Sequence, residues 1–296
     1  MTSKLRRKAL ACAALMTCLM APNAAKAIDI YPGDYTALPS GTNLALGYFG
    51  FTANSRLDIE GIGKIPKSRY QTAVGILRYL HYSDINGMPI AVQAFLPIGG
   101  FTQHQIGGVD ARSKSGIGDL TLGFTVFPLH GADQPGGTTV GLTAYVSAPT
   151  GNYSARAPFN IGTGTWYFTP QLGVIQNLGK GFFIDAAADV ALYIDHTEYG
   201  LKRSQDPSVQ LQAYLRYQFS PATSVSFGYS GHFGGRQSVG GTYTGLKTDS
   251  HGLRAFASHM LTPTWQISGV VGADIANAKG GFRNDFTGQI RLMKIF

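Results

Sequence analysis

Hydrophobic and polar residues alternate one by one along much of the chain, and the C-terminal stretch shows this clearly. One parity carries the apolar residues Phe282, Phe286, Ile290, Leu292 and Phe296, and the other carries the polar residues Arg283, Asp285, Thr287, Gln289 and Arg291. Successive side chains of a β-strand point to opposite faces, so this period of two predicts a strand with one apolar and one polar face.

The same alternation predicts twelve strands. Their approximate ranges are 42–52, 69–82, 89–98, 117–128, 138–148, 164–176, 182–194, 208–219, 223–233, 250–261, 264–275 and 282–296. An apolar face of four or five residues matches the apolar band that a tilted strand crosses in a bilayer. The pattern therefore predicts an all-β fold, a transmembrane antiparallel up-and-down β-barrel of about 12 strands. A soluble β-sandwich is the alternative.

The connections between the expected strands alternate in length. Short turns are expected at 83–88, 177–181, 220–222 and 262–263, and longer polar links at 53–68, 99–116, 149–163, 195–207 and 234–249. Outer-membrane barrels have short periplasmic turns and longer external loops, so this asymmetry favours a barrel in the outer membrane over a sandwich. An even number of strands places both chain ends on the periplasmic side.

The strand expected at 69–82 fits the pattern least well. Arg78 shares the parity of Val74, Ile76 and Leu80, so the alternation predicts that it faces lipid. It would lie near a strand end, where a long side chain can reach the lipid headgroups.

The N-terminus has the three parts of a secretory signal peptide. A positive segment (Lys4 to Lys8) precedes an apolar run at 9–21 and the small-x-small pattern Ala25-Lys26-Ala27. We therefore expect cleavage after Ala27, so that 1–27 is the leader and 28–296 is a single barrel domain. A lipoprotein signal acylated at Cys18 is the alternative.

The composition of residues 28–296 differs from that of the whole chain, which includes the leader. The leader carries five positive residues and no acidic one, so the formal net charge of +8 falls to +3 and gives little support for a nucleic-acid partner. Both cysteines, Cys12 and Cys18, also lie in the leader. The remaining chain therefore has no thiol chemistry, disulfide or Cys-ligated zinc, and no motif in it predicts a cofactor or a metal site.

Two segments carry a family resemblance. They are Ser115-Gly-Ile-Gly-Asp-Leu-Thr-Leu-Gly-Phe-Thr-Val-Phe-Pro128, and Ala148-Pro-Thr-Gly-Asn-Tyr153 followed by Asn160-Ile-Gly-Thr-Gly-Thr-Trp-Tyr-Phe-Thr-Pro-Gln-Leu-Gly173. Together they resemble the family named for the meta-pathway of phenol degradation, whose members are outer-membrane barrels regarded as transporters. The resemblance implies uptake of hydrophobic or aromatic compounds, and it assigns no binding residue.

Side chains on the polar face of each expected strand are predicted to line the lumen. The candidates are Asp119, Tyr145, Asp185, Asp189, Tyr193, Tyr214, Arg216, Arg254, Phe256, Asp274, Arg283, Asp285 and Arg291. The candidates include five carboxylates and four guanidinium groups. These charges nearly balance, whereas an ion-selective porin needs a ring of charges of one sign. A lumen of twelve strands lies between filled eight-stranded barrels and open sixteen-stranded porins, so it can hold a narrow channel.

These observations predict a non-enzymatic outer-membrane channel through which small hydrophobic or aromatic solutes diffuse. The expected partners are outer-membrane lipid, the solute, and the barrel-assembly machinery through the strand that ends in Phe296; the barrel is expected to be a monomer. One alternative is a lipid hydrolase that uses His81 and Ser83, which share one face of a strand. Another is a structural barrel whose lumen is plugged.

Overall fold

The computed structural model describes residues 29–276 and 278–296, and the expected leader at 1–27 lies outside the described residues. Twelve long strands dominate this described part: β1 (Asn43–Ile59), β3 (Arg69–Ile85), β4 (Met88–Ile106), β8 (Leu120–His130), β9 (Thr138–Ala148), β11 (Tyr167–Gly179), β12 (Phe182–Tyr193), β15 (Ser208–Ser220), β16 (Thr223–Gly234), β19 (Ser250–Thr262), β20 (Trp265–Asp274) and β21 (Gly281–Ile295). Across these same described ranges, no helix has the length and apolar character needed to cross a membrane.

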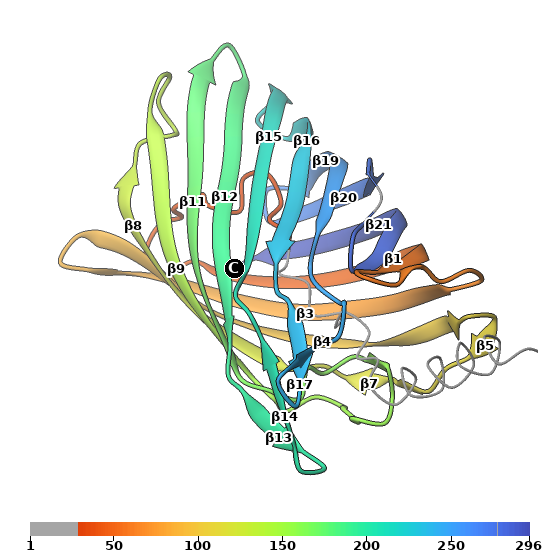
Figure 1. Ribbon diagram of the computed structural model, residues 1–296. Coiled ribbons are helices and arrows are strands. Elements are labelled where there is room, and N and C mark those ends of the chain that lie inside the picture. Colours follow the sequence, from red (N-terminus) through yellow and green to blue (C-terminus); the bar gives the residue numbers. More distant parts are fainter. Residues whose placement is uncertain (1–28, 277) are drawn as a thin grey trace, which may run out of the picture.

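The long strands form one closed antiparallel sheet. Each pairs with the next long strand along the chain, and β21 pairs with β1 to close the wall (Figure 1). At the closure, Asn43 and Phe296 exchange two backbone hydrogen bonds of 2.8 and 3.0 Å. Closure pairs every strand edge, which lipid requires because it offers no hydrogen bonds to the backbone. The predicted barrel is therefore confirmed.

Apolar side chains cover the outside of this barrel. On β15, the outward Leu211 and Leu215 are exposed, whereas the alternating Gln210, Gln212 and Tyr214 are buried inside. The same outward exposure holds for Phe49, Leu122, Leu142, Leu172, Phe227, Val271 and Ile290 on seven other strands. A sheet with an apolar outside and a polar inside is the arrangement that a bilayer favours.

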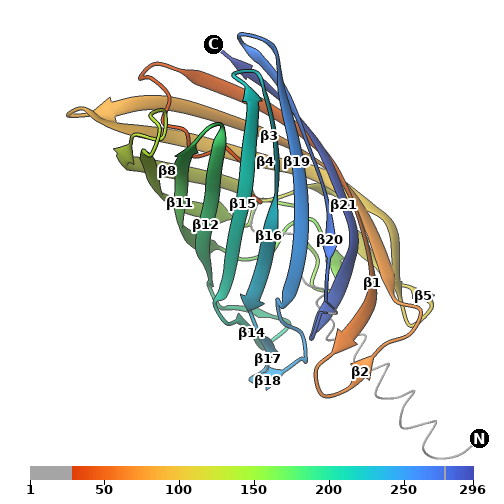
Figure 2. The ribbon, with the colours of Figure 1, turned by 90° about the horizontal axis from the view of Figure 1, so that it is seen from above.

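The two ends of the barrel differ. One end, called here the short-turn end, carries Phe296 and tight turns such as Asn86-Gly87 between β3 and β4. The opposite end, the long-loop end, carries a small sheet of β13 (His196–Glu198), β14 (Leu201–Gln205), β17 (Gln237–Val239) and β18 (Thr242–Tyr243) (Figure 2). Other short strands of the structure are β2 (Gly63–Lys64), β5 (Val109–Asp110), β6 (Ser113–Lys114), β7 (Gly116–Ile117) and β10 (Phe159–Asn160).

The predicted lipid-facing position of Arg78 is wrong. Arg78 is buried inside the barrel, and its neighbours Leu77 and Tyr79 are the exposed residues of β3. The alternation assigned Arg78 to the wrong face because β3 carries apolar residues on both faces, and Leu80 is also buried in the interior.

The alternation of the C-terminal strand also changes partway along it. Asp285 has no partner on β1, because Phe286 pairs with Ala53 and Asn284 with Asn54. Such a bulge inserts one extra residue, so the even-numbered side chains before Asp285 face the opposite side from those after it. Phe282 is therefore buried in the interior.

Candidate functional site

A segment that precedes the first strand enters the barrel. Residues 29–38, called here the plug and red in Figure 1, touch strands on several sides of the wall. Its tip is a β-turn in which the Asp34 amide donates to the Tyr31 carbonyl at 2.9 Å. Pro32 and Gly33 occupy the central positions, and Gly33 has a φ of 90°, as a type II turn requires. The turn presents the Asp34 carboxylate to side chains of the barrel wall.

Asp34 is held by two arginines from different strands. Its carboxylate lies 2.6 Å from Arg291 Nη1 on β21 and 3.0 Å from Arg78 Nη1 on β3. Arg78 also donates to Gln93 Oε1 and to the Tyr48 hydroxyl. Both guanidinium groups are buried, and breaking such a buried pair by removing one partner costs about 3–5 kcal/mol. This arrangement, called here the latch, fixes the plug to the wall.

Further polar contacts tie the plug to the other side of the barrel. Asp29 lies 3.2 Å from Arg254 Nε on β19 and accepts hydrogen bonds from Gln210 Nε2 and the Ser230 hydroxyl. The Gly33 amide donates to Asp185 at 2.8 Å. Asp185 also pairs with Arg216 at 2.8 Å, so the plug bridges opposite walls of the lumen.

Two tyrosines provide the apolar part of the plug. Tyr31 packs edge-on against Phe256, and Arg291 stacks over its ring at 4.1 Å. The Tyr35 ring lies against β9 and β11, where any Cβ at Gly141 or Gly173 would overlap it. These two glycines leave the space that the ring occupies.

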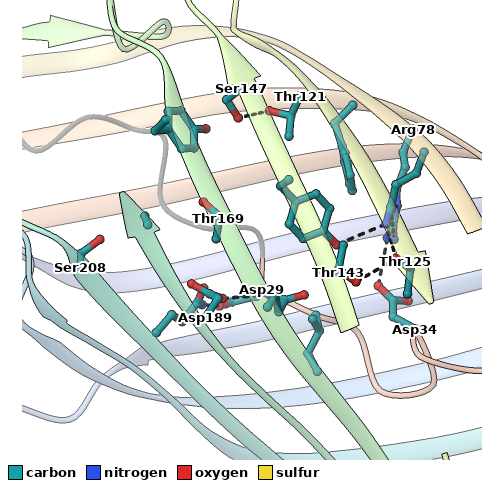
Figure 3. Close-up of a pocket in the computed structure, with 18 of the residues that line it drawn as sticks. Asp29, Asp34, Arg78, Thr121, Thr125, Thr143, Ser147, Thr169, Asp189 and Ser208 are labelled. Atoms are coloured by element: carbon teal, nitrogen blue, oxygen red, sulfur yellow. Dashed lines mark hydrogen bonds and ion pairs between the residues drawn. The ribbon is translucent and has the colours of Figure 1, made fainter. Parts of the chain in front are cut away.

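The rest of the lumen contains two cavities beside the plug. The first, called here the chamber, has a volume of about 110 Å³ and a wall of threonine, serine and aromatic side chains (Figure 3). The second, called here the vestibule, has a volume of about 350 Å³ and lies at the short-turn end. Both cavities are lined by Asp34, Arg78, Leu80 and Tyr82, so the latch stands between them.

Two more spaces continue toward the long loops. A cavity of about 30 Å³ shares Tyr193, Gln205 and Gln237 with the chamber. A surface groove of about 580 Å³ adjoins that cavity at Arg203. Arg203 pairs with Glu198, which also accepts a hydrogen bond from the Tyr153 hydroxyl. Burial and the adjacent Glu198 carboxylate raise the pKa of Tyr153, which keeps its hydroxyl a donor.

Asp119 organises the loop that covers the long-loop end. Its carboxylate accepts from the Gly151 amide at 2.8 Å, and from the Thr163 amide and hydroxyl at 2.7 and 2.6 Å. Three donors use most of the acceptor capacity of this buried carboxylate and hold the loop 150–163 in place. One of the residues so positioned is Phe159, which packs inside the barrel against Tyr70 and Phe282.

Replacing Asp119 with asparagine should loosen this loop. The amide would present donors where donors already point, and leaving buried N–H groups unpaired costs about 1–3 kcal/mol. We expect faster hydrogen exchange at the Gly151 and Thr163 amides. Asp110→Asn, at an exposed carboxylate, is the matched control; equal protection in both variants would contradict this role.

The structure distributes the predicted lumen residues among distinct places. Tyr145, Asp189 and Tyr193 line the chamber, Arg216 and Arg291 line the vestibule, and Asp185, Tyr214, Arg254 and Phe256 contact or flank the plug. Asp274 accepts from the Asn284 amide at 2.8 Å, near the long loops. Arg283 donates to the Asp274 carbonyl, and Asp285 lies 3.5 Å from the exposed Arg56.

Sequence reasoning missed the plug residues Asp29, Asp34 and Tyr35, as well as Arg78. The available signal was Tyr31-Pro32-Gly33-Asp34, a turn motif of defined geometry placed between the leader and the first strand. Nothing in that motif says where the turn lies, because its partners are as far away as residue 291.

The structure also places the residues of the hydrolase alternative. In the part of the chain that the structure describes, His81 Nδ1 forms a hydrogen bond with Asn43 Oδ1 at 2.9 Å. Ser83 pairs in register with Ile90 at the short-turn end. Over residues 29–276 and 278–296, no group of three His, Cys, Asp or Glu side chains is arranged to hold a metal ion.

Solved structures share this architecture. The COG4313 outer membrane channel from Pseudomonas putida F1 matches with a TM-score of 0.83 and 27% identity, over 90% of this chain and 100% of that chain. The transport unit of the autotransporter AIDA-I from Escherichia coli matches with a TM-score of 0.53 and 10% identity, over 96% of this chain and 97% of that chain. The second likeness shows the barrel fold alone. Among curated proteins, none matches the sequence.

The barrel, its apolar outside and its likeness to an outer membrane channel place this protein in the bacterial outer membrane. The short-turn end then faces the periplasm and the long-loop end faces outward. Residues 50–287 match the family described as "Putative MetA-pathway of phenol degradation". The chain therefore belongs to that family.

Proposed function

We propose that this protein is a channel through which small hydrophobic or aromatic compounds diffuse across the outer membrane. The observation that carries the proposal is the succession of spaces along the barrel: groove, small cavity, chamber and vestibule, each sharing wall residues with the next. The solute would move from the outside toward the periplasm, and no covalent chemistry is involved.

The lining of these spaces supports an apolar solute. Phe95, Phe127, Tyr145, Tyr167 and Tyr193 contribute rings to the chamber. Three of the carboxylates near the plug are neutralised by arginines, so no ring of one charge faces the path. Aromatic rings with a few polar groups are the usual lining of a site for a small organic molecule.

The size of the path limits what can pass. A volume of about 110 Å³ in the chamber is close to the roughly 150 Å³ of an engineered protein cavity that binds benzene. The chamber therefore suits one small ring at a time. The latch between chamber and vestibule would have to loosen for each passage, because Asp34 and Arg78 line both spaces.

Uptake of toluene by cells that produce the protein tests the proposal. We expect faster uptake than in cells without it, and a several-fold reduction when Thr169→Trp fills the chamber. Thr169 is buried and lines the chamber, and its side chain makes no hydrogen bond within the described residues, so its replacement by tryptophan mainly removes space. Thr197→Trp, at an exposed position of β13 outside the chamber, is the control. Uptake equal to that of cells without the protein would contradict a channel.

The plug favours a second candidate, a structural barrel whose lumen stays closed. The latch and the bridge to Asp185 would then be permanent. This candidate predicts neither toluene uptake nor any effect of Thr169→Trp.

The partners follow from the same surface. The exposed apolar band would contact outer-membrane lipid around the whole circumference, so the barrel would function as a monomer. The barrel-assembly machinery would engage the C-terminal strand, whose last ring, Phe296, is exposed at the periplasmic end.

A further inference from the structure

One interior carboxylate of the barrel differs from those that hold the plug. Asp29, Asp34 and Asp185 each pair with an arginine. Asp189 is also buried, at 3% exposure, and within the described residues it has no ion-pair partner. Among the described residues, its carboxylate accepts one hydrogen bond, from Gln171 Nε2 at 2.8 Å. A carboxylate can accept about four hydrogen bonds, so most of its capacity is unused.

A second unused acceptor lies beside it. Gln210 is directly opposite Asp189 in the register of β12 and β15. Gln210 Oε1 is buried, and no donor in the described part of the chain reaches it. The amide cannot simply turn over, because Gln210 Nε2 donates to Asp29 at 2.8 Å. Exchanging the positions of Gln210 Nε2 and Oε1 would place the amide oxygen against the Asp29 carboxylate.

The neighbouring glutamine is fixed in the same way. Gln171 Oε1 accepts from the Tyr35 hydroxyl at 2.6 Å, which directs Gln171 Nε2 to Asp189. The plug therefore orients both amides, through Tyr35 on one side and Asp29 on the other. What remains facing the chamber is the Asp189 carboxylate (Figure 3), whereas Gln210 Oε1 is buried without a donor among the described residues.

A buried acceptor without a donor costs free energy unless some molecule satisfies it. A donor that carries an apolar body suits this chamber, because Tyr145, Tyr167 and Tyr193 line the same space as Asp189. It must also be small, since the chamber holds about one six-membered ring. An aromatic carboxylate offers no donor and would meet a second negative charge at Asp189.

We propose that Asp189 forms a hydroxyl-recognition site, which selects monocyclic aromatic solutes that carry an O–H donor. This inference rests on the proposed function, because the solute must reach the chamber. The ring lies among the tyrosines, and the hydroxyl donates to Asp189. A site built to accept a hydrogen bond discriminates against an analogue without the donor, because the buried acceptor is then left unpaired.

Binding of phenol, anisole and toluene to the purified protein, followed by ligand-observed NMR, tests the site. Anisole keeps the oxygen of phenol but lacks the donor, so this comparison needs no variant. We expect phenol to bind about tenfold more tightly than anisole, as one charge-assisted hydrogen bond allows. Equal affinities would overturn the proposal, and tighter binding of benzylammonium than of phenol would replace it with a cation site.

The variant Asp189→Asn sharpens the test. The amide has the same shape, so we expect about a tenfold loss of phenol affinity and little change for toluene. Asp84→Asn, at an exposed carboxylate outside the chamber, should leave both unchanged. If Asp189→Asn weakens phenol and toluene equally, Asp189 has a structural role only.

The outcomes separate the two proposals. Toluene uptake by the wild-type protein together with equal binding of phenol and anisole would leave the channel in place and remove the hydroxyl site. Absence of uptake for every solute would remove the channel itself, whatever the binding measurements give.

Discussion

Deletion of residues 31–38 is expected to raise the single-channel conductance several-fold. These residues carry Tyr31, Asp34 and Tyr35, which fill the lumen between the chamber and the vestibule. Without them the two cavities merge into one water-filled path through the barrel. The wall should remain intact, because backbone pairing closes it independently of the plug.

The control for this experiment is Thr36→Ala. Thr36 belongs to the plug but is exposed, and its hydroxyl contacts only the Gly33 carbonyl among the described residues, so its loss should leave the conductance unchanged. Asp34→Asn should give an intermediate result, with more frequent opening, because it weakens the latch and keeps the bulk of the plug. Folding is checked by the heat-dependent gel mobility of intact barrels. A folded deletion variant with wild-type conductance would show that the plug does not limit the path.

Replacing Leu172 with arginine is expected to destabilise the folded barrel by about 2–4 kcal/mol, the cost of an arginine at the bilayer midplane. Leu172 lies near the middle of the 13-residue strand β11 and is 42% exposed on its outer face. The guanidinium would have to reach the headgroups from the centre of the apolar band. Equilibrium unfolding in lipid vesicles, followed by the fluorescence of Trp166 and Trp265, measures the change.

Leu178→Arg provides the matched comparison on the same strand. Leu178 is 52% exposed but lies at the turn end of β11. There an arginine reaches the interface, and the expected cost is about 0–1 kcal/mol. Similar destabilisation at both positions would argue against a membrane surrounding this face of the barrel.

The strands were predictable because their signal is local. Alternation along 208–219 reports directly which side chains of β15 face out, since adjacent residues of a strand point to opposite sides. The turn Asn86-Gly87 was equally local. Two failures of the pattern have separate causes. At Arg78 both faces of β3 are apolar, and at Asp285 an extra residue shifts the register.

The candidate site was only partly predictable. Tyr145, Asp189 and Tyr193 were found by parity, and the chamber contains them. The contacts between the plug and the wall were not predicted. Asp29 binds residues about 200 positions away, and Asp34 binds Arg291. No rule of sequence spacing connects residues that far apart, because they meet only when the wall closes around the plug.

The sequence alone determined that this chain forms an outer-membrane barrel, since contact with lipid on one face and with the lumen on the other imposes a period of two on most of its strands. Tertiary structure decided what the barrel encloses. It placed the segment before β1 inside the lumen, paired three carboxylates with arginines and left Asp189 without one. The physical reason is that charge pairing and cavity shape depend on distances through space, which alternation along a strand does not encode.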